Sequence, residues 1–211
     1  NSSAASDVYK RQSYEYAIKA EKAGADRIEL CRDLHLDGIT PDHESAKKTI
    51  DKLNIPVFVL IRPREGDFAY SDEEFELMKR DIIKFKEMGC KGIVSGILNN
   101  DNTIDIKRTN ELVNLSRPLE FTFHRAFDMV TDPLKELEKL IRLGVDRVLT
   151  SGQKKKAFKG IELLKELKKN SKDKIIIMPG SGINKSNIKK FKSFDEIHGS
   201  FKNEINTNIL P

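Results

Sequence analysis

Several polar residues of this chain end or directly follow short apolar runs, and their types suit acid–base chemistry or anion binding. Glu29 lies in the run 26–31, Arg62 follows the run 56–61, and His124 ends the run 119–124. Carboxylates and imidazoles serve as general acids and bases, whereas a guanidinium pairs with carboxylate or phosphate through parallel hydrogen bonds. We therefore predict Glu29 and His124 as candidate catalytic residues and Arg62 as an anion-binding residue. The alternative is a buried Glu29–Arg62 ion pair that only orders the structure.

Further candidate anion-binding residues follow the same or later apolar runs: Arg64, Arg125, Asp128, Ser151, Gly180, Ser181, Gly182 and His198. Within this set, segment 180–182 is glycine-rich and leads toward a predicted helix. Backbone N–H groups at such a position can hold an anion. A tight turn with no ligand is the competing interpretation.

Cys31 is the candidate metal ligand, because a thiolate is a soft donor that suits Cu(I). One thiolate makes a poor copper site by itself, and a buried, unreactive cysteine is the alternative. Cys90 lies at the start of the predicted strand at 92–96, whereas Cys31 ends the predicted strand at 26–31. The two cysteines should therefore lie at opposite ends of the strands. The sequence contains no His-Glu-x-x-His or paired-cysteine motif, which argues against a built-in zinc site.

The elements that must position these residues alternate regularly. Helix patterns cover 14–23, 41–53, 71–88, 106–115, 131–143, 156–169 and 185–191, and strand patterns cover 26–31, 56–61, 92–96, 119–124, 146–150, 174–178 and 196–198. Thr40 is a candidate N-cap of the second helix, and Ser71 with Glu74 forms a capping box. Seven strands, with one more expected before the first helix, predict a (β/α)8 TIM-type barrel. Its chemistry would lie at the carboxyl ends of the strands. A doubly wound sheet is the alternative, although no Gly-x-Gly-x-x-Gly follows the first strand.

Composition narrows the functional classes. The chain has 211 residues, 38% of them hydrophobic and 34% charged, with a net charge of +5. No apolar run approaches the ~18 residues of a membrane span, so we expect no membrane insertion. Lysines alternate with glutamates along the helix patterns, as in 165–169, so we expect solvated helix faces and no nucleic-acid partner. No secretory signal pattern is visible at the start of the sequence.

Several segments together resemble the CutC family of copper homeostasis proteins. They are 23–31, 38–41, 61–71 with Arg-Pro-Arg at 62–64, 123–128 with His-Arg-Ala-Phe-Asp at 124–128, 146–152, and 175–182. The resemblance implies a cytoplasmic TIM barrel, a homo-oligomer when full length, which binds copper and contributes to copper tolerance or trafficking. Cys31 would be the likeliest copper ligand.

The chain departs from the family pattern in three places. Residues 1–12 do not match the family's first strand, whose cysteine would supply a further ligand, and we interpret them as a tail preceding a barrel domain at 13–211. Cys90 stands where a small residue is usual, and the C-terminal helix of the family is missing. We therefore expect a barrel that is incomplete at strand 1 and at its C-terminal end.

Two functional hypotheses follow. The first is a cytoplasmic copper homeostasis protein that binds Cu(I). The second is an enzyme of unknown reaction that acts on a small anionic or phosphorylated substrate at the barrel mouth. A non-catalytic scaffold is a weaker third interpretation.

Overall fold

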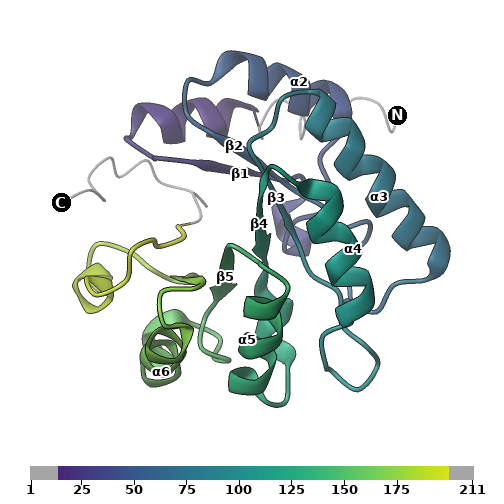
Figure 1. The fold of residues 1–211 in the computed structure, drawn as a ribbon. Coiled ribbons are helices and arrows are strands. Elements are labelled where there is room, and N and C mark those ends of the chain that lie inside the picture. The colour runs from purple at the N-terminus through teal and green to yellow at the C-terminus, as the bar shows by residue number, and fades with distance from the viewer. Residues whose placement is uncertain (1–13, 200–211) are drawn as a thin grey trace. The chain divides into compact units, whose positions relative to one another are not determined.

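The computed structural model describes residues 14–199, so the predicted tail 1–12 and the segment 200–211 lie outside the described residues. Residues 14–22 are helical. After them come, in chain order (Figure 1), β1 (Ile28–Leu30), η1 (Leu34–Leu36), α2 (His43–Lys52), β2 (Val57–Leu60), α3 (Asp72–Glu87), β3 (Gly92–Ser95), α4 (Ile106–Ser116), β4 (Glu120–Phe123), η2 (Arg125–Met129), α5 (Pro133–Arg142), β5 (Arg147–Thr150), η3 (Ala157–Lys159), α6 (Ile161–Ser171), β6 (Ile176–Pro179) and η4 (Ile188–Phe191). The predicted alternation of strand and helix is therefore confirmed over most of the chain.

The chain divides into two compact units. Among the described residues, the first comprises 14–95 and 115–120, and the second comprises 96–114 and 121–199. The first unit contains β1, β2 and β3, and the second is built around β4, β5 and β6.

Parallel strands form the centre of the first unit. β1 pairs with β2, with Ile28 opposite Val57, and β2 pairs with β3, with Phe58 opposite Gly92. All four residues of β2 are buried, as expected for a parallel strand with helices on its faces. A Cβ on Gly92 would stand 2.5 Å from the Phe58 ring, so this glycine makes room for the aromatic side chain.

The helix starts of the first unit follow local signals. The Ser71–Glu74 capping box is present at α3 in both directions, as predicted. The prediction of Thr40 as the cap of α2 is wrong: Asp42 caps it, and its carboxylate accepts a hydrogen bond from Ser45 N–H. Thr40 Oγ1 instead accepts from the Arg62 amide at 2.9 Å, so a contact distant in the sequence decides its role.

The second unit repeats the parallel arrangement. β4 pairs with β5, with Thr122 opposite Arg147, and β5 pairs with β6, with Val148 opposite Ile177. The α5 helix begins at Pro133 and is capped by Asp132, in agreement with the sequence. Arg147 is buried in β5, and its guanidinium forms an ion pair with the Glu196 carboxylate at 2.9 Å.

Three predicted elements of the second unit are shorter than the sequence patterns indicated. The helix predicted at 156–169 is divided into η3 and α6 at Gly160, where a Cβ would stand 2.1 Å from the Ser151 carbonyl oxygen. The segment 185–191 contains only the short η4, and the strand at 196–198 is a single bridge between Gly180 and His198. The described residues thus contain six strands rather than seven, and a complete (β/α)8 barrel is not shown.

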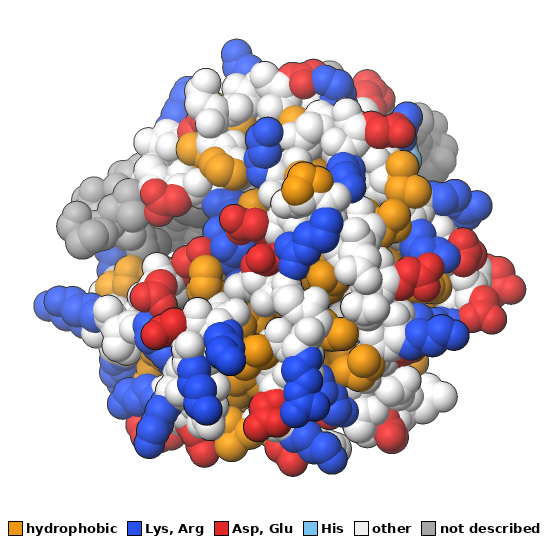
Figure 2. All heavy atoms as spheres, in the orientation of Figure 1, with side chains coloured by type: hydrophobic (Ala, Val, Ile, Leu, Met, Phe, Trp, Pro, Cys, Tyr) orange, Lys and Arg blue, Asp and Glu red, His pale blue; other side chains and the backbone are white. Residues whose placement is uncertain are grey.

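The surface agrees with the charge pattern of the sequence. Lys and Arg side chains are interspersed with Asp and Glu on the face drawn in Figure 2. Within residues 14–199, no helix combines the length and the apolar character that crossing a membrane requires.

Candidate functional site

In each unit, predicted site residues gather at the carboxyl ends of the strands. In the first unit, Glu29 lies within β1, and the other predicted residues follow β1 or β2: Cys31, Arg62 and Arg64. Those of the second unit follow β4, β5 and β6, and they are His124, Arg125, Asp128, Ser151, Gly180, Ser181, Gly182 and His198. Each cluster is described by itself below.

Arg62 ties two loops of the first unit to the end of β2. Its side chain is buried, and Nη1 donates to the carbonyl oxygens of Leu36 and Gly38, both at 2.9 Å. Nη2 donates to the Gly66 carbonyl oxygen at 3.0 Å. Nε is buried and has no acceptor among the described residues. Most of the guanidinium therefore binds the chain's own carbonyls, and Nε is the donor that an anion could still engage.

Arg64 is engaged by acidic side chains of its own unit. Its Nε donates to Glu74 at 2.6 Å, and its Nη2 donates to Asp67 at 2.9 Å. The hydrogen bond from Arg64 lowers the pKa of the Asp67 carboxyl. The anion-binding role predicted for Arg64 would thus require a ligand to compete with two carboxylates.

Glu29 and Tyr70 add polar groups to this end of the first unit. Glu29 lies in β1, and one of its carboxylate oxygens is buried. The Tyr70 hydroxyl is buried too, and burial raises the pKa of Tyr70 to about 12, although the charges of Arg62 and Arg64 oppose this shift. The sequence reasoning missed Tyr70. The available signal was a tyrosine that closes the polar segment following the Arg-Pro-Arg motif.

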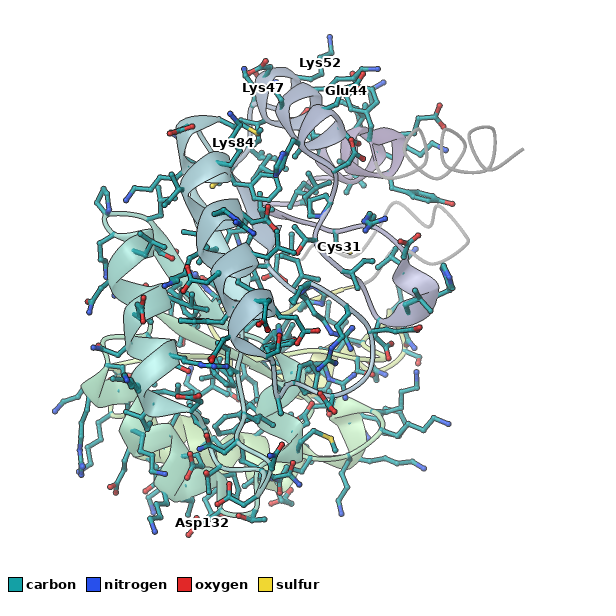
Figure 3. All side chains as sticks on the ribbon, turned by 90° about the vertical axis from the view of Figure 1, so that its right-hand side faces the viewer. Cys31, Glu44, Lys47, Lys52, Lys84 and Asp132 are labelled. Carbon is teal, nitrogen blue, oxygen red and sulfur yellow. The ribbon has the colours of Figure 1, made fainter. Side chains whose placement is uncertain are left out.

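The two cysteines occupy different environments within the first unit. Cys31 directly follows β1, is partly exposed and packs against a cluster of Phe58, Leu60 and Val94. Figure 3 shows it apart from the charged side chains of α2. Cys90 precedes β3 and is buried, and burial raises the pKa of its thiol to about 11. Since the strands are parallel, the two thiols lie at opposite strand ends, as predicted.

The part of the chain that the structure describes contains no cluster of His, Cys, Asp and Glu side chains of the kind that holds a metal ion. No group of three or more His, Cys, Asp and Glu residues within 14–199 could hold a metal ion. Within these residues, Cys31 therefore belongs to no such group.

In the second unit, Asp128 lies in η2 after β4, and its carboxylate accepts hydrogen bonds from the end of β5 and the loop that follows it. It accepts hydrogen bonds from Thr150 Oγ1 at 2.6 Å, Ser151 N–H at 3.0 Å and Gln153 N–H at 3.1 Å. Arg125 Nε donates to it at 2.7 Å, and Arg125 Nη2 donates to Ser151 Oγ. Arg125 and Ser151, which the sequence predicted to bind an external anion, thus donate hydrogen bonds to the carboxylate of Asp128.

His124 lies at the end of β4 and is buried. Its Nδ1 accepts from Ala126 N–H at 3.1 Å, so the neutral ring carries its proton on Nε2, which is also buried. A Cβ on Gly96 would stand 2.8 Å from ring atoms of His124, which shows that this glycine makes room for the imidazole. The geometry suits an imidazole that donates through Nε2. Its catalytic role stays a prediction.

The glycine-rich loop after β6 begins with a residue that continues the strand. Gly180 N–H donates to the Thr150 carbonyl at 3.0 Å, and His198 N–H donates to the Pro179 carbonyl at 2.8 Å. The backbone then turns through left-handed conformations at Ser181 (φ +80°) and Gly182 (φ +70°). The Gly180 amide is thus engaged within the sheet, whereas Ser181 and Gly182 form the actual loop.

Comparison with known proteins identifies the family. The sequence model of the CutC family matches residues 11–203. A CutC family protein from Photorhabdus laumondii is 46% identical over 186 residues, which are 87% of this chain and 75% of the relative. The human copper homeostasis protein cutC homolog is 48% identical over 178 residues, which are 84% of this chain and 65% of the relative.

Solved structures agree with this relationship. CutC from Streptococcus agalactiae matches with a TM-score of 0.80 at 32% identity, covering 84% of this chain and 90% of that one. The aldolase QR15 matches with a TM-score of 0.64 at 14% identity, covering 89% of this chain and 83% of that one, which shows a shared fold alone. The chain therefore belongs to the CutC family and has its TIM-barrel-like α/β fold.

Proposed function

We propose that this protein acts in copper homeostasis and binds Cu(I) through the Cys31 thiolate. The observation that carries the proposal is the position of Cys31, a partly exposed thiol at the carboxyl end of β1. Thiolates are the soft ligands that Cu(I) prefers. The name of the human relative, a copper homeostasis protein homolog, supports the same role.

Copper in this proposal is cargo. One thiolate makes a poor copper site by itself, and Cys31 belongs to no group of three or more His, Cys, Asp and Glu residues within 14–199. In this proposal, Cu(I) is shared with an exchangeable soft donor, such as a small thiol. A second copy of the chain is another source of that donor, which is why we retain the predicted homo-oligomer within the proposal. We place the protein in the cytoplasm, where reducing conditions keep a single thiol unoxidised.

Cys90 provides a matched control for the copper test. A chromophoric chelator would compete for Cu(I) under reducing conditions with the parent chain, Cys31→Ser and Cys90→Ser, with and without a small thiol. We expect tight binding by the parent and by Cys90→Ser in the presence of the thiol, and its loss in Cys31→Ser. Equal binding by Cys31→Ser and the parent, with all three proteins folded by circular dichroism, would contradict the proposal.

The two thiols should also differ in their reaction with an alkylating reagent, because the thiolate is the nucleophile. The pKa of Cys90, raised to about 11, leaves roughly a hundredfold less thiolate at pH 8 than an ordinary cysteine has. We expect labelling of Cys31 before Cys90 in the folded chain. The labelling of Cys90 should rise as the pH approaches 11. Mass spectrometry of peptides after timed labelling measures both rates, and equal rates at pH 8 would be evidence against the assignment of Cys31 as the accessible thiol.

An enzyme acting on a small anionic substrate is the second candidate. It is favoured by Arg62, a buried cation whose Nε has no acceptor within residues 14–199. Glu29, which belongs to the same unit, would then act as the general acid or base. A screen of anionic metabolites by thermal shift on the Cys31→Ser variant separates the candidates, since stabilisation that survives this substitution does not depend on copper.

A further inference from the structure

The loop 181–183 of the second unit holds three backbone donors without protein acceptors. Within the described part of the chain, the N–H groups of Ser181, Gly182 and Ile183 form no hydrogen bond. The next amide, that of Asn184, donates to Asn187 Oδ1 at 2.9 Å and so ends the run. Three consecutive donors of this kind form a concentrated positive potential at one loop.

The same loop is held in place through its other polar atoms. The Ser181 carbonyl accepts from Ala157 N–H at 2.9 Å, and Ser181 Oγ donates to the Lys155 carbonyl at 2.9 Å. The Gly182 carbonyl accepts from Asn187 Nδ2 at 2.8 Å. With both carbonyls engaged, the loop presents its amides in a preorganised conformation, which reduces the entropy lost when a ligand binds.

Lys156 packs onto this loop because residue 182 is glycine. A Cβ on Gly182 would stand 2.5 Å from Lys156 Cδ and 3.4 Å from its Cγ and Cε. Lys156 has no acidic partner within residues 14–199, and neither do its neighbours Lys154 and Lys155. A lysine without a counter-ion thus lies against a loop with three amides available.

We propose that Lys156 and the amides of residues 181–183 bind the phosphate group of a small phosphate monoester. The donors comprise N–H groups and one ammonium, and a phosphate offers several charged acceptor oxygens to such a set. A monoester fits better than free phosphate, because the loop lies at the carboxyl end of β6. The remainder of the ligand could extend from there along the strand ends, where this type of fold performs its chemistry. This site does not depend on copper binding at Cys31.

Calorimetric titration of the full chain at constant ionic strength tests the proposal, with glycerol 3-phosphate and inorganic phosphate as the probes. We expect the monoester to bind the parent and to bind Lys156→Met about tenfold more weakly or worse, the effect of losing a charged hydrogen bond. Lys154→Met removes the same charge from the same segment and should change the affinity less than about twofold. Gly182→Ala should also weaken binding, because its Cβ displaces Lys156.

Three results would overturn the proposal. The first is that the folded parent does not bind the monoester, and the second is that Lys154→Met and Lys156→Met weaken its binding equally. The third is that the parent binds inorganic phosphate but not the monoester. The second result would mean general attraction to lysines. The Cu(I) titration of Lys156→Met should match that of the parent, so failure of the phosphate site and failure of the copper proposal are distinguishable.

Discussion

The two units organise the loops at their strand ends with charges of opposite sign. In the first unit, the buried cation Arg62 donates to the carbonyl oxygens of Leu36, Gly38 and Gly66. In the second unit, the carboxylate of Asp128 accepts from donors of the loop after β5. A central cation engages carbonyls, whereas a central anion engages N–H groups.

This difference bears on what each unit can bind. A loop whose carbonyls surround an arginine has those acceptors engaged, and the partly exposed Cys31 thiol lies 3.1 Å from where a Cβ on Gly38 would stand. In the second unit, Asp128 satisfies the amides of the loop after β5, whereas the amides at 181–183 stay available. The proposed site for a soft cation thus belongs to the first unit, and the proposed site for an anion belongs to the second.

The largest effect should come from Arg62→Met. This substitution keeps much of the side-chain volume but leaves three carbonyl oxygens without their donor, and we expect a loss of about 3–5 kcal/mol in the free energy of unfolding. Arg64→Met is the control, because Arg64 is 36% exposed and its ion pairs should contribute only about 1 kcal/mol. Urea unfolding followed by circular dichroism measures both, and equal losses would refute the central role of Arg62.

Asp128→Asn should have an intermediate effect. Asparagine retains one acceptor oxygen but turns an NH2 group toward the donors of the second unit, so we expect a loss of about 2 kcal/mol. Asp132→Asn makes the same chemical change at the N-cap of α5, where asparagine is well tolerated, and should cost less than about 0.5 kcal/mol. If both variants unfold at the same urea concentration, Asp128 is not the organising anion of this loop.

The smallest effects should come from single partners of the two central charges. Ser151→Ala removes a hydroxyl that contacts Asp128 at 2.9 Å, and Thr40→Val removes the acceptor of the Arg62 amide. Each should lower the free energy of unfolding by about 1 kcal/mol, the net contribution of one hydrogen bond. A loss in either variant that equals the loss from its central residue would show that one partner, rather than the charge, organises the loop.

Local patterns predicted the elements well where their signals lie within a few residues. The capping box at Ser71 and Glu74 is present as expected, and α5 begins at Pro133, within the helix pattern predicted at 131–143. The continuous helix expected at 156–169 was wrong, because Gly160 lies against Ser151, nine positions earlier in the chain, and interrupts it. No pattern within the helix itself indicates that contact.

The candidate site could be predicted by residue type but not by role. Arg62 and Asp128 were recognised as polar residues following apolar runs, yet their partners come from loops between 4 and 26 positions away. Tyr70 and Lys156 escaped notice, because burial and packing against a glycine are properties of the fold.

The sequence by itself determined the alternation of strands and helices, the family of the chain and the residue types at the strand ends, because periodicity, caps and motifs are local. The tertiary structure alone decided which loop carries a cation and which an anion at its centre, and which amides stay available. Those features depend on hydrogen bonds between residues distant in the chain, which form only after the strands have paired.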